Sequence, residues 1–195
     1  MQSTATPIGG ASNHPGTGGF LDPEKIVNGF GVEEGMRIAD FGCGAGYFTI
    51  ILAEKVGSGG RVYAFDIIES VLDVIRTKAR YRQLDNIEAI RTNLEIAGGS
   101  GLPDNSQDIV LLANIIFQSK KKGDIIKEGV RILKKGGEMI IIDWENNSGG
   151  FGPPNGFRAD KSNIRSIAEG EGLSFDGDLA TGSFHFGMVF KKPKA

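Results

Sequence analysis

The segment from Met36 to Phe48 constrains the fold of this chain more than any other. Residues 37–41 predict a strand, and three alternating glycines follow at positions 42, 44 and 46 before an apolar helical stripe begins at Phe48. Glycine allows a tight turn and lets a ligand approach the backbone without meeting a β-carbon. A strand, a glycine-rich turn and a helix in this order predict a nucleotide-binding α/β unit.

The rest of the chain continues the alternation of strand and helix. Short apolar runs predict strands at residues 37–41, 61–65, 87–91, 109–113 and 138–142. Amphipathic stripes predict helices through Ile68, Val71, Leu72, Ile75 and Ala79, and through Ile125, Ile126, Val130 and Leu133, the second closed by Gly136 and Gly137. This alternation indicates an α/β fold with parallel strands. Residues 184–190 alternate with period two, which predicts a last strand with one buried face, paired in a hairpin with residues 173–179.

Composition and length predict one domain. With 195 residues, 39% of them hydrophobic and 24% charged, the chain resembles an ordinary globular protein below the size at which chains usually divide. Residues 20–195 are therefore expected to form a single domain. Residues 1–19 are mostly Gly, Ser, Thr, Pro, Asn and Ala, which predicts a flexible arm.

Charge and cysteine content narrow the class of protein. A formal net charge of -2 provides no strong field for nucleic acid or anionic lipid. A single cysteine, Cys43, excludes an internal disulfide and a cysteine-built zinc site. Because the chain shows neither a leader pattern nor an apolar run of about 18 residues, a cytoplasmic protein is expected.

The nucleotide class depends on glycine spacing and on a carboxylate. Asp66 ends the second predicted strand, where acidic residues of nucleotide-binding folds accept hydrogen bonds from ribose hydroxyls. The dinucleotide pattern G-x-G-x-x-G fails, because Tyr47 or Thr49 stands at its third glycine position. No Gly-Lys pair exists for a P-loop. The remaining pattern has Asp40 followed by glycines at 42, 44 and 46.

That pattern resembles the first motif of class I S-adenosylmethionine-dependent methyltransferases. The resemblance extends from about Phe20 to Phe157 and is nearest to small methyltransferases with UbiE-like sequences. Three further stretches look like successive motifs of that family: residues 57–66, residues 93–95 with 102–108, and residues 131–137. Each motif is weak alone, but the set in this order and spacing is specific.

The resemblance implies a fold and a function. The fold would be a Rossmann-like, doubly wound sheet of seven strands, mostly parallel with an antiparallel C-terminal hairpin strand. The function would be in-line methyl transfer from S-adenosylmethionine to a small-molecule acceptor. The methionine end of the cofactor would lie against the glycine loop near Asp40, the ribose on Asp66, the adenine on Asn93 and Leu94, and the methyl group beside Asn114. The cofactor-binding residues implied are Asp40, Phe41, Gly42, Cys43, Gly44, Gly46, Asp66, Ile67, Asn93, Leu94 and Asn114.

The catalytic residue stays unassigned. Relatives often carry histidines after the fourth strand, where this chain has Phe117, Gln118 and Ser119, so an imidazole base is not expected there. Asp143 is a candidate site residue because ligands bind at the carboxyl ends of parallel strands. Trp144 is expected to pack in the core or to stack on an aromatic acceptor. Cys43 is expected to be structural, and His14 and His185 to be surface or packing residues.

Other interpretations stay open at this stage. Lysines at 120–122, 134–135 and 191–192 suggest a nucleic-acid methyltransferase as one alternative, and a non-catalytic, regulatory cofactor-binding protein is another. No metal is expected, although Asn114, Asp143, Asn146 and Asn147 offer oxygens to a hard cation. The acceptor cavity is expected to be shaped by residues 98–103, by the loop at 146–156, and by residues 1–19, which form either a lid or a plain tail. The oligomeric state is open.

Overall fold

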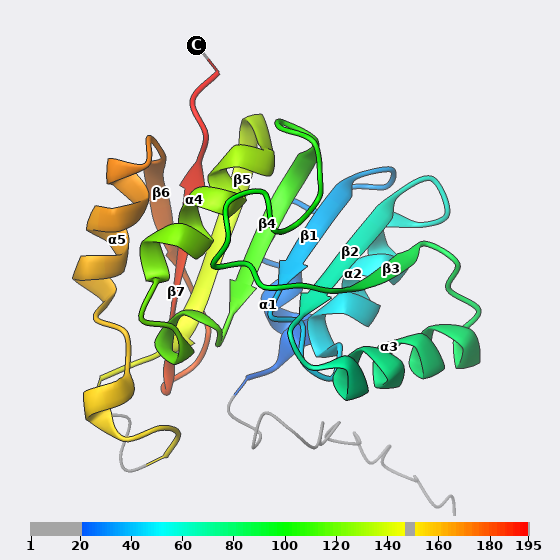
Figure 1. Ribbon diagram of the computed structural model, residues 1–195, viewed down its shortest axis with the longest axis horizontal. Coiled ribbons are helices and arrows are strands. Elements are labelled where there is room, and N and C mark those ends of the chain that lie inside the picture. The colour runs from blue at the N-terminus through cyan, green and yellow to red at the C-terminus, as the bar shows by residue number, and fades with distance from the viewer. Residues whose placement is uncertain (1–20, 147–150, 195) are drawn as a thin grey trace, which may run out of the picture.

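A seven-stranded sheet organises the chain in the computed structural model, which describes residues 21–146 and 151–194 (Figure 1). The predicted arm at 1–19 lies outside the described residues, and so do His14 and Asn147. The strands are β1 (Arg37–Phe41), β2 (Arg61–Asp66), β3 (Ile87–Arg91), β4 (Gln107–Ala113), β5 (Leu133–Trp144), β6 (Ser174–Leu179) and β7 (His185–Lys191).

The strand order confirms the predicted doubly wound topology. The order is β3-β2-β1-β4-β5-β7-β6, with β1 to β5 parallel and β7 antiparallel to both β5 and β6. The order reverses between β1 and β4, and ligands of such sheets bind at the carboxyl ends of the strands beside that reversal. The fold thus defines an edge of the sheet at which to look for a site.

Helices cover both faces of the sheet. They are α1 (Pro23–Val27), α2 (Tyr47–Val56), α3 (Glu69–Tyr81), α4 (Lys122–Ile132) and α5 (Lys161–Gly170), with short 3-10 turns η1 (Ile116–Gln118) and η2 (Asn155–Phe157). Side chains of α1 and α2 pack with Ile38 of β1 on one face, and those of α4 and α5 pack with Ala39 and Phe41 on the other. Because both faces are covered, β4 and β5 contain continuous apolar runs, at residues 109–112 and 139–142.

The predicted end of α4 was wrong. The helix ends at Ile132, and Leu133 to Gly137 belong to β5. Backbone pairing replaces the helix there, because Gly136 donates its N–H to the Lys192 carbonyl and Gly137 accepts from the Lys192 N–H. The Lys192 ammonium also donates to the carbonyls of Val130 and Leu133, which caps the end of the helix.

Two burial predictions were also wrong. Strand β7 was expected to bury one face, but His185 and Gly187 are buried as well as Phe186 and Met188. The second face is covered by side chains: the Trp144 ring packs on His185, and Thr181 and Leu179 leave no room for a β-carbon at Gly187. Ile68 was expected on the buried stripe of α3, but it precedes the helix as its N-cap and is 54% exposed.

Candidate cofactor site

The glycine loop after β1 is folded against the end of β2. The N–H groups of Gly42 and Cys43 both donate to the Phe65 carbonyl, at 2.8 and 2.9 Å. The φ angles at Gly42, Gly44 and Gly46 are +72°, +49° and +77°, a region that side-chain-bearing residues rarely adopt. The three glycines are therefore required by the conformation of this turn.

A cleft of about 400 Å³ opens beside this loop, at the carboxyl ends of the central strands. Its walls come from the glycine loop, the end of β2, the segment after β3 and the segment after β4. The lining residues are Gly42, Gly44, Asp66, Ile67, Ile68, Val71, Thr92, Asn93, Leu94, Glu95, Ile115, Gln118, Ser119 and Ile125. Of the residues predicted for the cofactor, the structure brings together Gly42, Gly44, Asp66, Ile67, Asn93 and Leu94 on these walls.

The carboxylate of Asp66 is held in a fixed orientation on one wall. Oδ2 accepts from the Gly44 N–H at 3.0 Å, and Oδ1 accepts from the Ile68 N–H at 2.9 Å. A carboxylate oxygen accepts more than one hydrogen bond, so each oxygen has capacity for a ribose hydroxyl. Asp66 therefore has the geometry of a ribose ligand and also supports the glycine loop.

Asp40 and Phe41 at the end of β1, and Cys43 within the glycine loop, are buried and do not line the cleft. Asp40 Oδ2 accepts from the Thr49 hydroxyl at 2.6 Å. Burial, with a contribution from the charge of Asp66, raises the pKa of Asp40 to about 6. Burial also raises the pKa of the Cys43 thiol, so the thiolate that a nucleophile needs is not formed at neutral pH.

Gly46 and Asn114 also stand outside the lining of the cleft. Gly46 is the N-cap of α2, and a β-carbon there would lie 2.6 Å from Ile75 Cγ1. Asn114 follows β4 with φ +56°, and its buried Oδ1 has no hydrogen-bond partner among the described residues. A buried acceptor without a donor is costly, so Asn114 is suited to receive a donor from a ligand.

Two walls of the cleft are joined by one hydrogen bond. Asn93 Oδ1 accepts from the Glu95 N–H at 2.9 Å, which shapes the turn after β3. Glu95 Oε1 accepts from the Ser119 hydroxyl at 2.6 Å, across to the segment after β4. The adenine end predicted for Asn93 and Leu94 is thus bordered by both segments.

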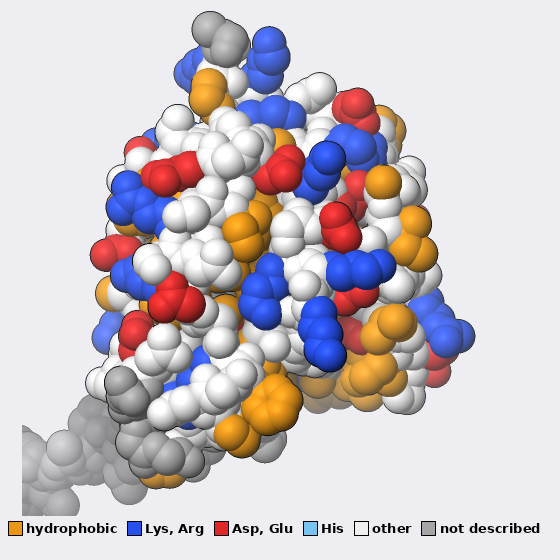
Figure 2. Space-filling view, turned by 60° about the vertical axis from the view of Figure 1, so that its left-hand side comes forward, with side chains coloured by type: hydrophobic (Ala, Val, Ile, Leu, Met, Phe, Trp, Pro, Cys, Tyr) orange, Lys and Arg blue, Asp and Glu red, His pale blue; other side chains and the backbone are white. Residues whose placement is uncertain are grey.

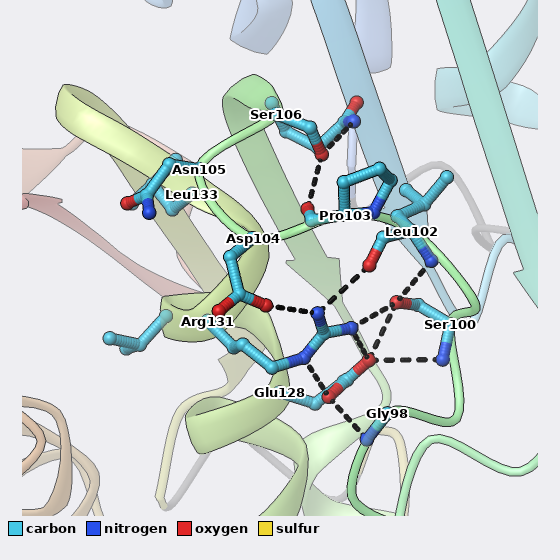
Figure 3. Close-up of polar contacts among 12 residues, drawn as sticks. Gly98, Ser100, Leu102, Pro103, Asp104, Asn105, Ser106, Glu128, Arg131 and Leu133 are labelled. Atoms are coloured by element: carbon cyan, nitrogen blue, oxygen red, sulfur yellow. Dashed lines mark hydrogen bonds and ion pairs between the residues drawn. The ribbon is translucent and has the colours of Figure 1, made fainter.

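An ion pair between the buried Glu128 and the partly buried Arg131 holds the loop between β3 and β4 (Figure 3). It was not predicted from the sequence. The Glu128 carboxylate on α4 accepts from Gly98 and Ser100 amides, the Ser100 hydroxyl and the Arg131 guanidinium. Burial opposes its ionisation, but these bonds, first that of Arg131, hold the pKa of Glu128 at about 2. Arg131 also donates to the Leu102 carbonyl and pairs with Asp104. The only signal in the sequence was the spacing of Glu128 and Arg131 on one helix face.

Trp144 packs in the structure rather than facing the cleft. The centroid of its ring lies 4.2 Å from that of His185, and Gly152 packs so closely on the Trp144 ring that it has no room for a β-carbon. Burial and the charge of Arg158 lower the pKa of His185 to about 4, so the imidazole is neutral at pH 7. These contacts support the packing interpretation of both residues.

Residues 21–146 and 151–194 contain no group of three His, Cys, Asp or Glu side chains placed to hold a metal ion. Among the helices of those residues, none is long and apolar enough to cross a bilayer.

The fold and the cleft define a class I nucleotide-binding methyltransferase architecture, and comparison with known proteins names the family. A methyltransferase domain model matches residues 32–170. The chain belongs to this family, the class I S-adenosylmethionine-dependent methyltransferases. S-adenosylmethionine is the cofactor of the family.

Individual relatives give finer information. A demethylmenaquinone methyltransferase of Geobacillus sp. (strain WCH70) is 32% identical over 120 residues, 62% of this chain and 50% of that protein. The chain spans about half the length of the curated relatives it matches. The structure of a SAM-dependent methyltransferase from Aquifex aeolicus is similar with a TM-score of 0.82 and 28% identity, covering 92% of this chain and 94% of that one. The [4+2]-cyclase SpnF shares the fold, with a TM-score of 0.75 and 14% identity, over 89% and 81% of the two chains.

The described residues fit S-adenosylmethionine. A β-carbon at Gly44 would meet no atom within 4 Å, so the absent side chain leaves space for a ligand at the wall of the cleft. Asp66 offers acceptors to hydroxyls, and the orphaned Asn114 Oδ1 offers one to an ammonium group. The exposed side chains of Ile67 and Ile68 provide an apolar surface for the adenine ring.

Proposed function

We propose that this chain transfers a methyl group from S-adenosylmethionine to a small-molecule acceptor. The observation that carries the proposal is the cleft in which Gly44 and Asp66 are hydrogen-bonded at the carboxyl ends of β1 and β2. The similarity to demethylmenaquinone methyltransferases supports a small acceptor. The proposed cofactor-binding residues are Asp40, Phe41, Gly42, Cys43, Gly44, Gly46, Asp66, Ile67, Asn93, Leu94 and Asn114.

The chain's own residues bind and orient the reactants. The bound cofactor supplies a methyl group on a sulfonium, which is an excellent leaving group. The protein therefore has to align the acceptor and exclude water, and needs a base only for an acceptor that loses a proton. Asp143 and His185 are buried and stand outside the lining of the cleft, so we assign neither as a base.

The lysine runs give the nucleic-acid alternative little support. Lys134 pairs with Asp108 at 2.7 Å and Lys191 pairs with Asp176 at 2.8 Å. The Lys122 ammonium donates to the Ser119 carbonyl. On the face in Figure 2, Lys and Arg side chains are interspersed with Asp and Glu side chains. A mixed surface of this kind does not provide the basic stripe that nucleic-acid binding uses.

We also propose that residues 20–195 form one domain that carries both the cofactor and acceptor sites. The family model covers most of this range, and the sheet is continuous through it. Removal of residues 1–19 is expected to leave the thermal midpoint nearly unchanged.

A turnover assay tests the proposed activity. The full chain is incubated with S-adenosylmethionine and a panel of small quinols, phenols and amines, with transfer RNA as a separate arm, and S-adenosylhomocysteine is measured by mass spectrometry. The proposal predicts S-adenosylhomocysteine and one methylated small molecule in equal amounts. Turnover on RNA alone, or cofactor binding without turnover on any arm, would contradict it.

A further inference from the structure

The carboxylate of Asp143, at the end of β5, is fully buried and bonded to backbone amides. Oδ2 accepts from the Phe117 N–H at 3.0 Å, and Oδ1 accepts from the Trp144 N–H at 2.8 Å. The Ile116 amide also stabilises the ionised group. Asp143 therefore ties the end of β5 to the turn η1.

The turn η1 needs such support. It has three residues, and the internal bonds of its segment are those from Gln118 N to Ile115 O and from Ser119 N to Ile116 O, at 3.1 and 3.3 Å. Short 3-10 turns have poor hydrogen-bond geometry and depend on their surroundings. The carboxylate satisfies amides at the start of η1, where a helix has no internal acceptors.

Residues 115–119, the wall segment, form one side of the cofactor cleft through Ile115, Gln118 and Ser119. At its start, Ile115 packs so closely on the glycine loop that a β-carbon at Gly42 would lie 2.7 Å from Ile115 Cδ1. At its end, the Ser119 hydroxyl binds Glu95 on the opposite wall. The position of the wall segment therefore sets the distance between walls that the cofactor has to fit.

We propose that Asp143 is a positioning residue for the cofactor site, which it serves by fixing the backbone of η1 and thereby the places of Ile115 and Ser119. The inference rests on the proposed function, because it assumes that the cleft holds the cofactor. Asp143 stands outside the lining of the cleft and acts through the wall segment.

The energetics of Asp143 agree with this role. Burial raises the pKa of Asp143 to about 6, although bonds from three amides and the charge of Lys122 oppose the rise. An ionised carboxylate in this place is therefore a cost to the fold, and an apolar side chain would fill the same volume at lower cost. What an apolar side chain would not supply is acceptors for the η1 amides.

The test compares D143N with a matched control. The Asn side chain keeps the shape but has one acceptor oxygen in place of two and no charge, so the bonds from the η1 amides are lost or weakened. The control is Asn86→Ala, which removes a buried polar side chain that donates to the carbonyls of Ala53 and Gly57. Asn86 lies at the amino end of β3, at the opposite edge of the sheet from the cleft. Titration calorimetry with S-adenosylhomocysteine is run well below both thermal midpoints.

D143N is expected to raise the dissociation constant at least about fivefold, while Asn86→Ala lowers the thermal midpoint and leaves binding unchanged. Ser119→Ala is then added to each background. If Asp143 acts through the wall segment, Ser119→Ala raises the dissociation constant by a smaller factor in D143N than in the unsubstituted chain. The reason is that the effects of coupled residues on binding are not additive. A purely structural role predicts full additivity.

Three results would overturn the inference. They are an unchanged dissociation constant in D143N, an equal rise of the dissociation constant in D143N and Asn86→Ala, or effects of D143N and Ser119→Ala on the binding free energy that are fully additive. If the unsubstituted chain fails to bind S-adenosylhomocysteine, the proposed function fails, and this inference fails with it. If D143N does not fold, Asp143→Val takes its place, because an apolar side chain removes the acceptors without a buried charge. A raised dissociation constant for S-adenosylhomocysteine in that variant supports the role, and an unchanged one overturns it.

Discussion

The N–H of Gly44 donates a 3.0 Å hydrogen bond to Oδ2 of Asp66. This bond makes the glycine loop after β1 and the carboxylate after β2 one unit, although the sequence separates them by a whole helix. In the proposed binding mode, a substitution at Asp66 would therefore act both on the ribose and on the conformation of the glycine loop.

Asp66→Ala should weaken binding of S-adenosylhomocysteine at least about tenfold, because hydrogen bonds to a charged acceptor are worth roughly 1.5 to 3 kcal/mol each. Titration calorimetry measures the change, and circular dichroism checks that the fold persists. Asp73→Ala is the control, since Asp73 lies on α3 with an exposed side chain that pairs with Arg76. An unchanged dissociation constant in Asp66→Ala would show that Asp66 does not bind the ribose.

Asp40→Asn should stabilise the unliganded chain and weaken cofactor binding. The folded pKa of about 6 exceeds the ordinary 3.8, so the stability that Asp40 contributes is complete below pH 3.8 and is lost as the pH rises through 6. The neutral Asn side chain avoids that loss. Its advantage in unfolding free energy should be absent near pH 3.5 and reach about 2 to 3 kcal/mol above pH 7.

Denaturant unfolding of Asp40→Asn at these two pH values measures the difference, and calorimetry measures binding. A variant that is less stable than the parent at pH 7 would show that the buried carboxylate has a stabilising partner. If the variant binds the cofactor with the same dissociation constant as the parent, Asp40 does not contribute to cofactor binding.

Glu128→Gln should have the opposite pH dependence. The pKa of Glu128 is lowered from 4.5 to about 2, so its stabilising contribution is present above pH 4.5 and is lost as the pH falls through 2. The variant should be less stable than the parent by about 3 kcal/mol at pH 7, and the gap should narrow below pH 4.5. Asp104→Asn is the matched control, because Asp104 also pairs with Arg131 but has a side chain that is 68% exposed. A gap of constant size between pH 7 and pH 3 would contradict the ionic role.

Arg158→Ala should loosen the loop after β5. The guanidinium donates to the carbonyls of Pro153, Glu145 and Phe151, at 2.8, 2.5 and 2.5 Å, and so holds three points of this loop. Limited proteolysis should cleave the variant faster between residues 151 and 158, with binding of S-adenosylhomocysteine unchanged. The control is Arg165→Ala, on the exposed face of α5. Equal cleavage of parent and variant would show that the loop is held by other contacts.

The features that the sequence predicted well depend on local chemistry. The glycine loop was predictable because positive φ angles at Gly42, Gly44 and Gly46 leave their mark as glycines in the sequence. Strands β4 and β5 were predictable from their apolar runs at residues 109–112 and 139–142, because both of their faces are covered. The seven-stranded arrangement came from the resemblance to a family, since strand order is not encoded in any single segment.

The features that were missed depend on neighbours distant in the chain. Both faces of β7 are buried because Trp144 packs on His185, and Thr181 and Leu179 pack on Gly187. The period-two pattern of β7 contains no information about these contacts. The Glu128 network joins α4 to amides of Gly98 and Ser100, and a backbone amide has no signature in a sequence. The role of Asp143 in η1 was not predictable for the same reason, because its carboxylate accepts a hydrogen bond from the backbone amide of Phe117.

Titration calorimetry of the full chain measures whether the cleft beside Gly44 and Asp66 binds S-adenosylmethionine. S-adenosylmethionine and S-adenosylhomocysteine should bind with one site per chain, and NAD should give little or no heat under the same conditions. Binding of both methionine nucleosides should be lost or strongly weakened in Asp66→Ala. Tight binding of NAD with no response to either methionine nucleoside would contradict the account.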